Sequence, residues 1–290
     1  MSTRTARIQM VTAMTIFGTI GLFVRWIPLP SAVIALARGF IGMLFLLALM
    51  AVRKMPISRE ALRKNLFWLL ISGALLGFNW ILLFESYRYT SVATGTLCYY
   101  MAPILIILAS PVVLRERLTA KKVLCVLAAL GGMVCISGVL SQGIPSAVEL
   151  KGILLGLAAA VLYAAIVLCN KQIHAISAYE KTIFQLGISV LAMLPYCALT
   201  VSPDALTFGP RVVFMLLLVG IVHTGVTYFL YFGSMEYLSG QSVAVISYID
   251  PVVAVIVSVL ILREPMHLTE GIGAVLILGA AAASELGEQA

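Results

Sequence analysis

The chain has 290 residues, of which 62% are hydrophobic and only 11% charged, and its mean hydropathy is +1.08. A soluble domain of this length needs more polar surface than this composition supplies, so the soluble globular classes are excluded. The net charge of +7 does not indicate nucleic-acid binding, because the basic residues lie mainly in short segments between apolar runs, where membrane topology places them. The five cysteines all lie within predicted membrane helices and are expected to be free thiols.

Apolar runs of about 20 residues, the length that crosses the hydrocarbon core of a bilayer, follow one another along the whole chain. In chain order, the predicted membrane helices are Ile8–Trp26, Ser31–Val52, Leu66–Ser86, Ser91–Leu114, Lys122–Leu140, Gly152–Asn170, Tyr179–Thr200, Val212–Gly233, Ser239–Leu262 and Thr269–Glu285. Prolines mark most of the joints between them. We therefore expect an all-α membrane protein with ten transmembrane helices.

The distribution of basic residues predicts how these helices are oriented. If the N-terminus is cytoplasmic, most of the 19 Lys and Arg residues fall in the segments on the cytoplasmic side. Because Lys and Arg accumulate on that side of a membrane, both termini are expected in the cytoplasm.

The chain also contains an internal repeat. The stretch Ser91–Glu116 recurs as Ser239–Glu264, and the matched positions include Tyr100 with Tyr248 and Pro103 with Pro251. Each half has an odd number of helices, so the second half is expected to be inverted relative to the first. The predicted domains are a five-helix repeat over residues 1–145 and an inverted one over 146–290. Inverted repeats are typical of secondary transporters whose substrate site lies between the repeats near the midplane.

The repeated Tyr-x-x-Pro segments and two further motifs, Leu-Arg-Glu-Arg-Leu and Leu-Arg-Glu-Pro at corresponding helix ends, carry a family resemblance. With the ten-helix plan, they make the whole chain resemble the EamA-type branch of the drug/metabolite transporter superfamily. The resemblance implies a multi-pass protein of the bacterial inner membrane that exports or imports amino acids and related metabolites, often by proton exchange. It also implies a central cavity formed by the first four helices of each half, with the fifth packing outside.

Asp250 is the strongest candidate for the site, because a carboxylate near the middle of a membrane helix is costly and is a functional-site hypothesis by default. Burial favours the neutral form of a carboxylic acid and a nearby cation favours the charged form, so the proton affinity of such an aspartate can be tuned. Asp250 is therefore predicted to bind a proton or a substrate amine, the alternative being a cap on the helix broken at Pro251.

Three further ionisable residues lie within the predicted helices. Arg38 is predicted to bind a substrate carboxylate through its two-pronged guanidinium, unless it extends to the outer headgroups or pairs with Glu85. His223 suits a proton relay because histidine titrates near neutral pH, although a lone histidine in a helix bundle is more often a hydrogen-bonded packing residue. Glu85 is the third candidate for proton coupling and lies at the outer end of its helix.

Several other side chains complete the predicted site. Aromatic rings near an anionic group can enclose an ammonium group, and polar amides can bind substrate or simply join helices. The additional substrate-binding candidates are Asn79, Trp80, Tyr99, Tyr100 and Tyr248, with Tyr228, Tyr231 and Gln185 as weaker ones. Pro103 and Pro251 each remove a helix hydrogen bond and are predicted hinges. The Arg115–Glu116 and Arg263–Glu264 pairs are interpreted as structural locks at helix ends, with a gating role as the less favoured alternative.

The chain has no GxxxxGK[ST] loop for nucleotide hydrolysis and no cluster with metal-ligand spacing, so no cofactor or metal is expected. The favoured function is a proton-coupled exporter of amino acids or related small metabolites that works by alternating access. A carrier for cationic amines or drugs is the alternative, and an intramembrane enzyme acting on lipid is the third possibility. The expected partners are a small-molecule substrate and membrane lipid, with no nucleic acid, and the protein is expected to be a monomer or weak dimer.

Overall fold

The computed structural model describes residues 2–55, 57–113, 120–136, 145–235, 237–238 and 246–285, and all regular structure within these ranges is helical. The α-helices are α1 (Thr3–Gly18), α2 (Ile20–Trp26), α3 (Ser31–Val52), α4 (Arg59–Tyr89), α5 (Val92–Tyr99), α6 (Ala102–Val113), α7 (Ala120–Ile136), α9 (Ala147–Asn170), α10 (Ala178–Thr200), α11 (Pro210–Leu218), α12 (Thr227–Met235), α14 (Ile249–Ile256) and α15 (Leu268–Glu285). A short 3₁₀ helix, η1 (Pro203–Ala205), and two π-helical segments, η2 (Val219–Val226) and η3 (Val257–Ile261), complete the set.

Within the described residues, each predicted membrane helix overlaps an observed helical segment, whereas parts of Ser91–Leu114, Lys122–Leu140 and Ser239–Leu262 lie outside the described residues. Helix α3 has the predicted bounds, and α4 is longer than predicted because a capped polar turn from Ser58 onward extends it at its N-terminus. Some predicted single helices are interrupted in the structure. The first predicted helix is divided between α1 and α2 at Thr19, whose hydroxyl donates to the Ile16 carbonyl at 2.8 Å.

The surface of the bundle is apolar while many polar side chains lie inside it. Leu199 is 87% exposed and Val275 72%, whereas Asn79 and Ser72 are fully buried. A large exposed apolar surface of this kind is unfavourable in water, whereas lipid favours an apolar exterior. Among the described residues, the helical segments long and apolar enough to cross a membrane are Thr3–Trp26, Ser31–Val52, Arg59–Tyr89, Ala147–Asn170, Ala178–Thr200 and Pro210–Ser234. The protein is therefore a multi-pass membrane protein.

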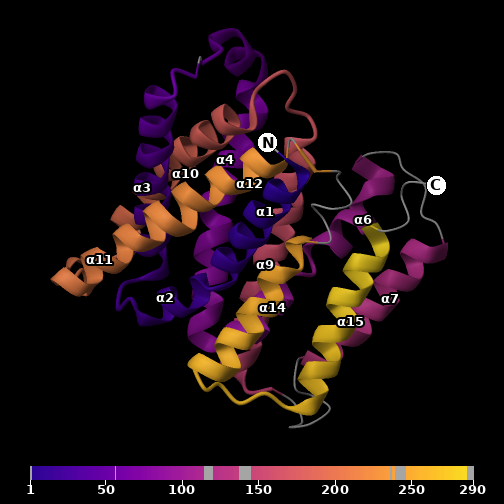
Figure 1. Ribbon diagram of the computed structural model, residues 1–290. Helices are drawn as coiled ribbons and strands as arrows, with labels where there is room; N and C mark the ends of the chain where they lie inside the picture. The colour runs from indigo at the N-terminus through magenta and orange to yellow at the C-terminus, as the bar shows by residue number, and fades with distance from the viewer. Residues whose placement is uncertain are drawn as a thin grey trace.

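Helix α4 runs through the centre of the bundle (Figure 1) and packs along α9 and α10. On the other side, the continuous segment formed by α11, η2 and α12 packs against α1 and α3. Helices α5 and α6 pack on α9, and α14 packs on α1. Helices α7 and α15 lie side by side away from the larger group of helices, on the right of Figure 1.

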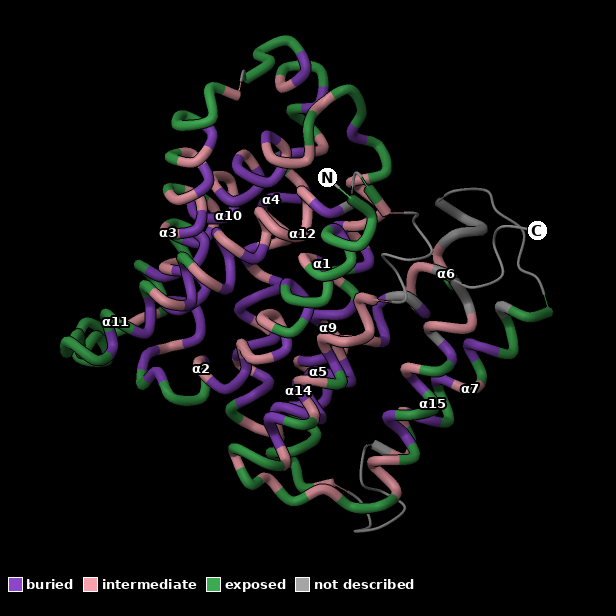
Figure 2. Tube along the Cα trace, in the orientation of Figure 1, coloured by how far each residue is buried: buried purple, intermediate pink, exposed green. Residues whose placement is uncertain are grey.

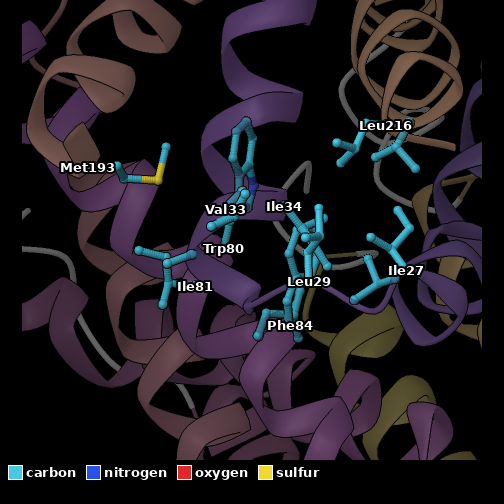
Figure 3. Packing of buried hydrophobic residues seen from close by; sticks show 14 of the residues in the cluster. Ile27, Leu29, Val33, Ile34, Trp80, Ile81, Phe84, Met193 and Leu216 are labelled. Carbon is cyan, nitrogen blue, oxygen red and sulfur yellow. The ribbon is translucent and has the colours of Figure 1, made fainter. Parts of the chain in front are cut away.

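The main hydrophobic core joins α2, α3, α4, α10 and α11. Figure 2 shows that the buried residues lie along the inner faces of these helices, and Figure 3 shows Trp80 and Phe84 of α4 among aliphatic side chains that include Ile34 and Met193. Phe84 and Met193 are fully buried, and Trp80 is 5% exposed. The rings of Trp80 and Phe84 also line the cavity described below. The core that joins α3 to α4 therefore forms one wall of the site.

Candidate functional site

Two helices are interrupted beside the prolines that the repeat contains. Helix α5 ends at Tyr99 and α6 begins at Ala102, so the turn lies at Tyr100 and Met101, just before Pro103. Helix α14 begins at Ile249, with Tyr248 at its N-cap and Pro251 buried within its first turn. The backbone angles at the two tyrosines are nearly the same, φ −73° and ψ 5° at Tyr100 and φ −72° and ψ −7° at Tyr248. Because proline has no N–H to donate, each helix lacks a backbone hydrogen bond at this point. Motion of the helices about these prolines remains a prediction.

A cavity of about 90 Å³ opens between these interrupted helices and the core. It is lined by residues of α1, α2, α3, α4, α5 and α14 and by the turn after α5, whereas α7 and α15 contribute none of the described lining residues. Five of the predicted site residues line it together, namely Arg38, Trp80, Tyr99, Tyr100 and Asp250. The cavity therefore combines one basic and one acidic side chain with aromatic walls.

Asp250 forms the acidic end of the cavity. The Tyr100 hydroxyl donates a hydrogen bond of 2.8 Å to Asp250 Oδ2. The Tyr100 ring lies 6.1 Å from the ring of Tyr99 and 6.5 Å from that of Tyr248, centroid to centroid. Tyr248 thus supports the Tyr100 ring without lining the cavity itself. The hydroxyl orients one carboxylate oxygen, and the other Asp250 oxygen has no side-chain partner among the described residues.

Arg38 forms the basic end. Its side chain is 4% exposed, and its Nε donates a hydrogen bond of 3.0 Å to Thr224 Oγ1 in the π-helical segment η2. The guanidinium carbon lies 4.1 Å from the centroid of the Trp80 ring and 5.5 Å from that of Phe84, so two aromatic faces hold it in place. The two terminal nitrogens have no hydrogen-bond partner in the described part of the chain, although they belong to a cavity-lining side chain. This geometry leaves the fork of Arg38 available for an anionic group.

The ends of the cavity are not joined to each other. Arg38 and Asp250, both described, form no ion pair within 4.0 Å, and Arg38 forms none with Glu85 either. The pair of Arg38 with Glu85, considered as an alternative role for Arg38, is therefore absent from this structure. Glu85 instead accepts a 2.6 Å hydrogen bond from the Ser31 hydroxyl and lies 3.9 Å from the guanidinium of Arg88.

The other predicted polar candidates lie outside the cavity lining. His223 is 2% exposed, with Nε2 3.0 Å from the Thr19 hydroxyl and its ring 4.9 Å from that of Phe23. Asn79 donates to the Ala159 carbonyl at 2.6 Å, which links α4 to α9. Gln185 donates to the Ser72 hydroxyl at 2.7 Å and to Asn170 at 2.6 Å. The contacts of Asn79 and Gln185 match the helix-joining alternative weighed for them.

Several residues that line the cavity were not predicted from the sequence. Tyr87 and Thr96 both line the cavity, and the Tyr87 hydroxyl lies 3.1 Å from Thr96 Oγ1. Phe17 and Phe84 also line it, and Thr224 positions Arg38 from behind. Thr96 lies one helical turn before Tyr100, a spacing that could have marked it. Tyr87 and Thr224 carry no comparable signal, because their roles depend on contacts between distant helices.

Of the two Arg-Glu pairs at the helix ends, the described residues include only Arg263–Glu264. Arg115 and Glu116 lie outside the described residues. Glu264 pairs with Arg25 at 2.5 Å, and no ion pair joins it to its neighbour Arg263, although both are described. The glutamate therefore holds a distant helix.

Known proteins resemble this chain over nearly its whole length. The model of the EamA-like transporter family matches residues 5–138 and 150–284. The chain is 32% identical to the "Uncharacterized transporter YxxF" of Bacillus subtilis (strain 168), over 94% of this chain and 87% of that protein. It is 28% identical to an "Uncharacterized transporter" of Archaeoglobus fulgidus, over 92% of both chains. A solved crystal structure has the same fold, with a TM-score of 0.66 at 21% identity over 97% of each chain. The chain belongs to the EamA-like transporter family.

Proposed function

We propose that the protein is a secondary active transporter that exports a small zwitterion, such as an amino acid or a related metabolite, in exchange for protons. The observation that carries this proposal is the presence of Arg38 and Asp250 in one cavity without an ion pair between them. A carboxylate group of the substrate would bind the open fork of Arg38, and its ammonium group would bind Asp250 beside the Tyr100 hydroxyl.

The same arrangement supports coupling to protons. Asp250 is the one acidic residue among the described lining residues. Its carboxylate can hold either a proton or the ammonium group of the substrate, because protonation removes the negative charge that the ammonium group needs. Competition for one carboxylate makes the release of one ligand depend on the arrival of the other. Exchange of substrate for protons follows directly from such competition.

We further propose that the chain has ten membrane helices in two inverted repeats, residues 1–145 and 146–290, in the bacterial inner membrane with both termini cytoplasmic. Two observations support this architecture. The family model matches twice, once in each half. The packing is also reciprocal: α4 of the first half packs on α9 and α10, and the matching segment from α11 to α12 packs on α1 and α3, their counterparts. Alternating access would then exchange the roles of the two halves.

The position of Arg38 bears on the two other functions considered. A carrier for cationic amines would place an arginine away from its cavity, whereas Arg38 lines it. An intramembrane enzyme would need a second reactive group beside Asp250, and His223 points to Thr19 instead and is not among the lining residues. The zwitterion carrier is the function that uses both charged ends of the cavity.

Flux measurements on proteoliposomes test the proposal. A panel of neutral, cationic and anionic amino acids and of simple amines is assayed with and without a proton gradient, using the wild type and the variants Arg38→Gln and Asp250→Asn. Loss of about two charged hydrogen bonds should raise the KM of Arg38→Gln about 100-fold, and Asp250→Asn should lose its response to the gradient. The matched control is Glu60→Gln, since Glu60 is exposed and its one ion pair with a described residue is with Lys64. Unchanged zwitterion transport by both site variants would refute the proposal.

A further inference from the structure

Glu264 joins three separate helices at the end of the bundle opposite the start of α1. Its Oε1 accepts a 2.5 Å hydrogen bond from Arg25 Nη2, at the end of α2. Its Oε2 accepts a 2.9 Å hydrogen bond from the backbone N–H of Val92, the first residue of α5, and another from the Ser258 hydroxyl in η3. Arg25 also donates to the carbonyl of Tyr87 near the end of α4. One carboxylate thus holds α2, α5 and the end of the ninth predicted helix together.

These contacts lie one helical turn beyond the cavity wall on each helix. Gly21, Thr96 and Ala254 line the cavity, and each is four residues from a residue that binds Glu264. The pairs are Gly21 with Arg25, Thr96 with Val92 and Ala254 with Ser258. Four residues of helix span about 6 Å at 1.5 Å per residue. The network around Glu264 therefore closes the cavity at this end.

Helices α2 and α5 also approach each other closely at this end, where Gly21 lies against the side chain of Val92. A Cβ atom placed on Gly21 would lie 2.3 Å from Cγ1 of Val92, so only glycine allows α2 and α5 to approach this far. A zwitterion can enter or leave this end only if α2 separates from α5.

We propose that Arg25 and Glu264 form a latch that opens and closes this end of the cavity in each transport cycle. The inference rests on the proposed transport function and adds its gating residues. The exposure of the two side chains supports a reversible contact, since Arg25 is 34% and Glu264 12% exposed. A pair that reaches water is rehydrated when it separates, whereas a fully buried pair would leave two unsolvated charges. With the N-terminus cytoplasmic, the latch lies on the outer side.

Thiol labelling measures the closure without any transported solute. In a background whose five cysteines are replaced by serine, Ala254→Cys places a thiol on the cavity wall. A membrane-impermeant maleimide is added to intact cells and, in a second arm, to inverted vesicles. Glu264→Gln should raise the labelling rate from outside about tenfold. Gly21→Ala, which separates α2 from α5 by steric contact, should act in the same direction, whereas Gly271→Ala meets nothing within 4 Å and should not. Equal labelling rates in all four proteins from both sides would refute the latch.

A reversible cross-link tests whether the latch must open. The Cβ atom built on Gly21 lies 3.4 Å from Cβ of Val92, close to the separation of about 3.5–4.5 Å found in disulfides. In the cysteine-free background, the double variant Gly21→Cys with Val92→Cys should transport when reduced and stop when oxidised, with recovery after a reductant. Equal flux in the fully oxidised and reduced protein would show that this end does not open.

The two assays separate failure of the latch from failure of the transport proposal. If no solute in the panel crosses the membrane with the wild type, the proposed function fails, and the labelling rates still decide whether Glu264 closes the cavity. If zwitterions are transported and labelling does not respond to Glu264→Gln or Gly21→Ala, the latch fails alone.

Discussion

The hydrogen bond between Thr224 and Arg38 provides a direct test of how the basic end of the cavity is positioned. Thr224 is fully buried, and its Oγ1 accepts from Arg38 Nε at 3.0 Å. Thr224→Val keeps the shape of the side chain and the methyl group that packs beside Gly42, but it removes the acceptor. A hydrogen bond to a charged group contributes about 1.5–3 kcal/mol. The stack on Trp80 at 4.1 Å remains, and it keeps the guanidinium in the cavity without fixing its rotation.

We expect the lost orientation to appear as weaker substrate binding. If about half of that energy, about 0.75–1.5 kcal/mol, is lost from binding, the KM for a zwitterion rises about three- to tenfold. The turnover rate should change less than the KM, because Thr224 does not line the cavity. The assay is proteoliposome flux at a series of solute concentrations, with the thermal unfolding midpoint in detergent as the folding control. Thr224→Ser retains the acceptor and should stay within about twofold of the wild type. Equal KM values for Thr224→Val and Thr224→Ser would refute this account of Arg38.

Two further predictions concern stability. Gly18→Ala would place a Cβ atom 2.5 Å from the carbonyl oxygen of Asp250, so overpacking between α1 and α14 should cost about 1–3 kcal/mol; a thermal midpoint in detergent no lower than that of the open-site control Gly279→Ala would contradict this. Glu180→Ala should lower the midpoint more than Glu149→Ala. Both glutamates form the same capping box, worth about 1 kcal/mol, but Glu180 also accepts from the N–H of Ser58, the N-cap of α4, at 2.6 Å. Equal midpoints for the last two variants would show that this link between α10 and α4 adds nothing.

Much of the fold could be predicted from the sequence because the relevant signals are local. The bounds of α3 and the C-terminal ends of α9 and α10 agree with the predicted helices, since apolar length and capping residues act within a few positions. The interruption at Pro251 was predictable for the same reason, because proline cannot donate a hydrogen bond wherever it occurs. Asp250 was identified because an acidic residue in the middle of an apolar segment is visible in the sequence alone and is costly at that depth.

The site was only partly predictable, because it depends on which face of each helix turns inward. Asn79 and Trp80 are adjacent in α4, yet Trp80 lines the cavity and Asn79 joins α4 to α9. Successive residues on a helix point about 100° apart, and an apolar helix in lipid has no strong pattern to show which direction is inward. The rotation of α4 is decided by its packing against α9 and α10.

The amino-acid sequence was enough to predict a helical membrane protein, the positions of many of the described helices, the breaks beside two prolines and a carboxylate within an apolar segment. The partners of the charged groups could not be predicted in this way, because tertiary packing sets them. Arg38 binds Thr224, 186 positions away, and Glu264 binds Arg25, 239 positions away, in preference to the adjacent Arg263. Helix formation depends on residues within a turn or two of each other, whereas these pairs exist only because packing brings distant helices within hydrogen-bond distance.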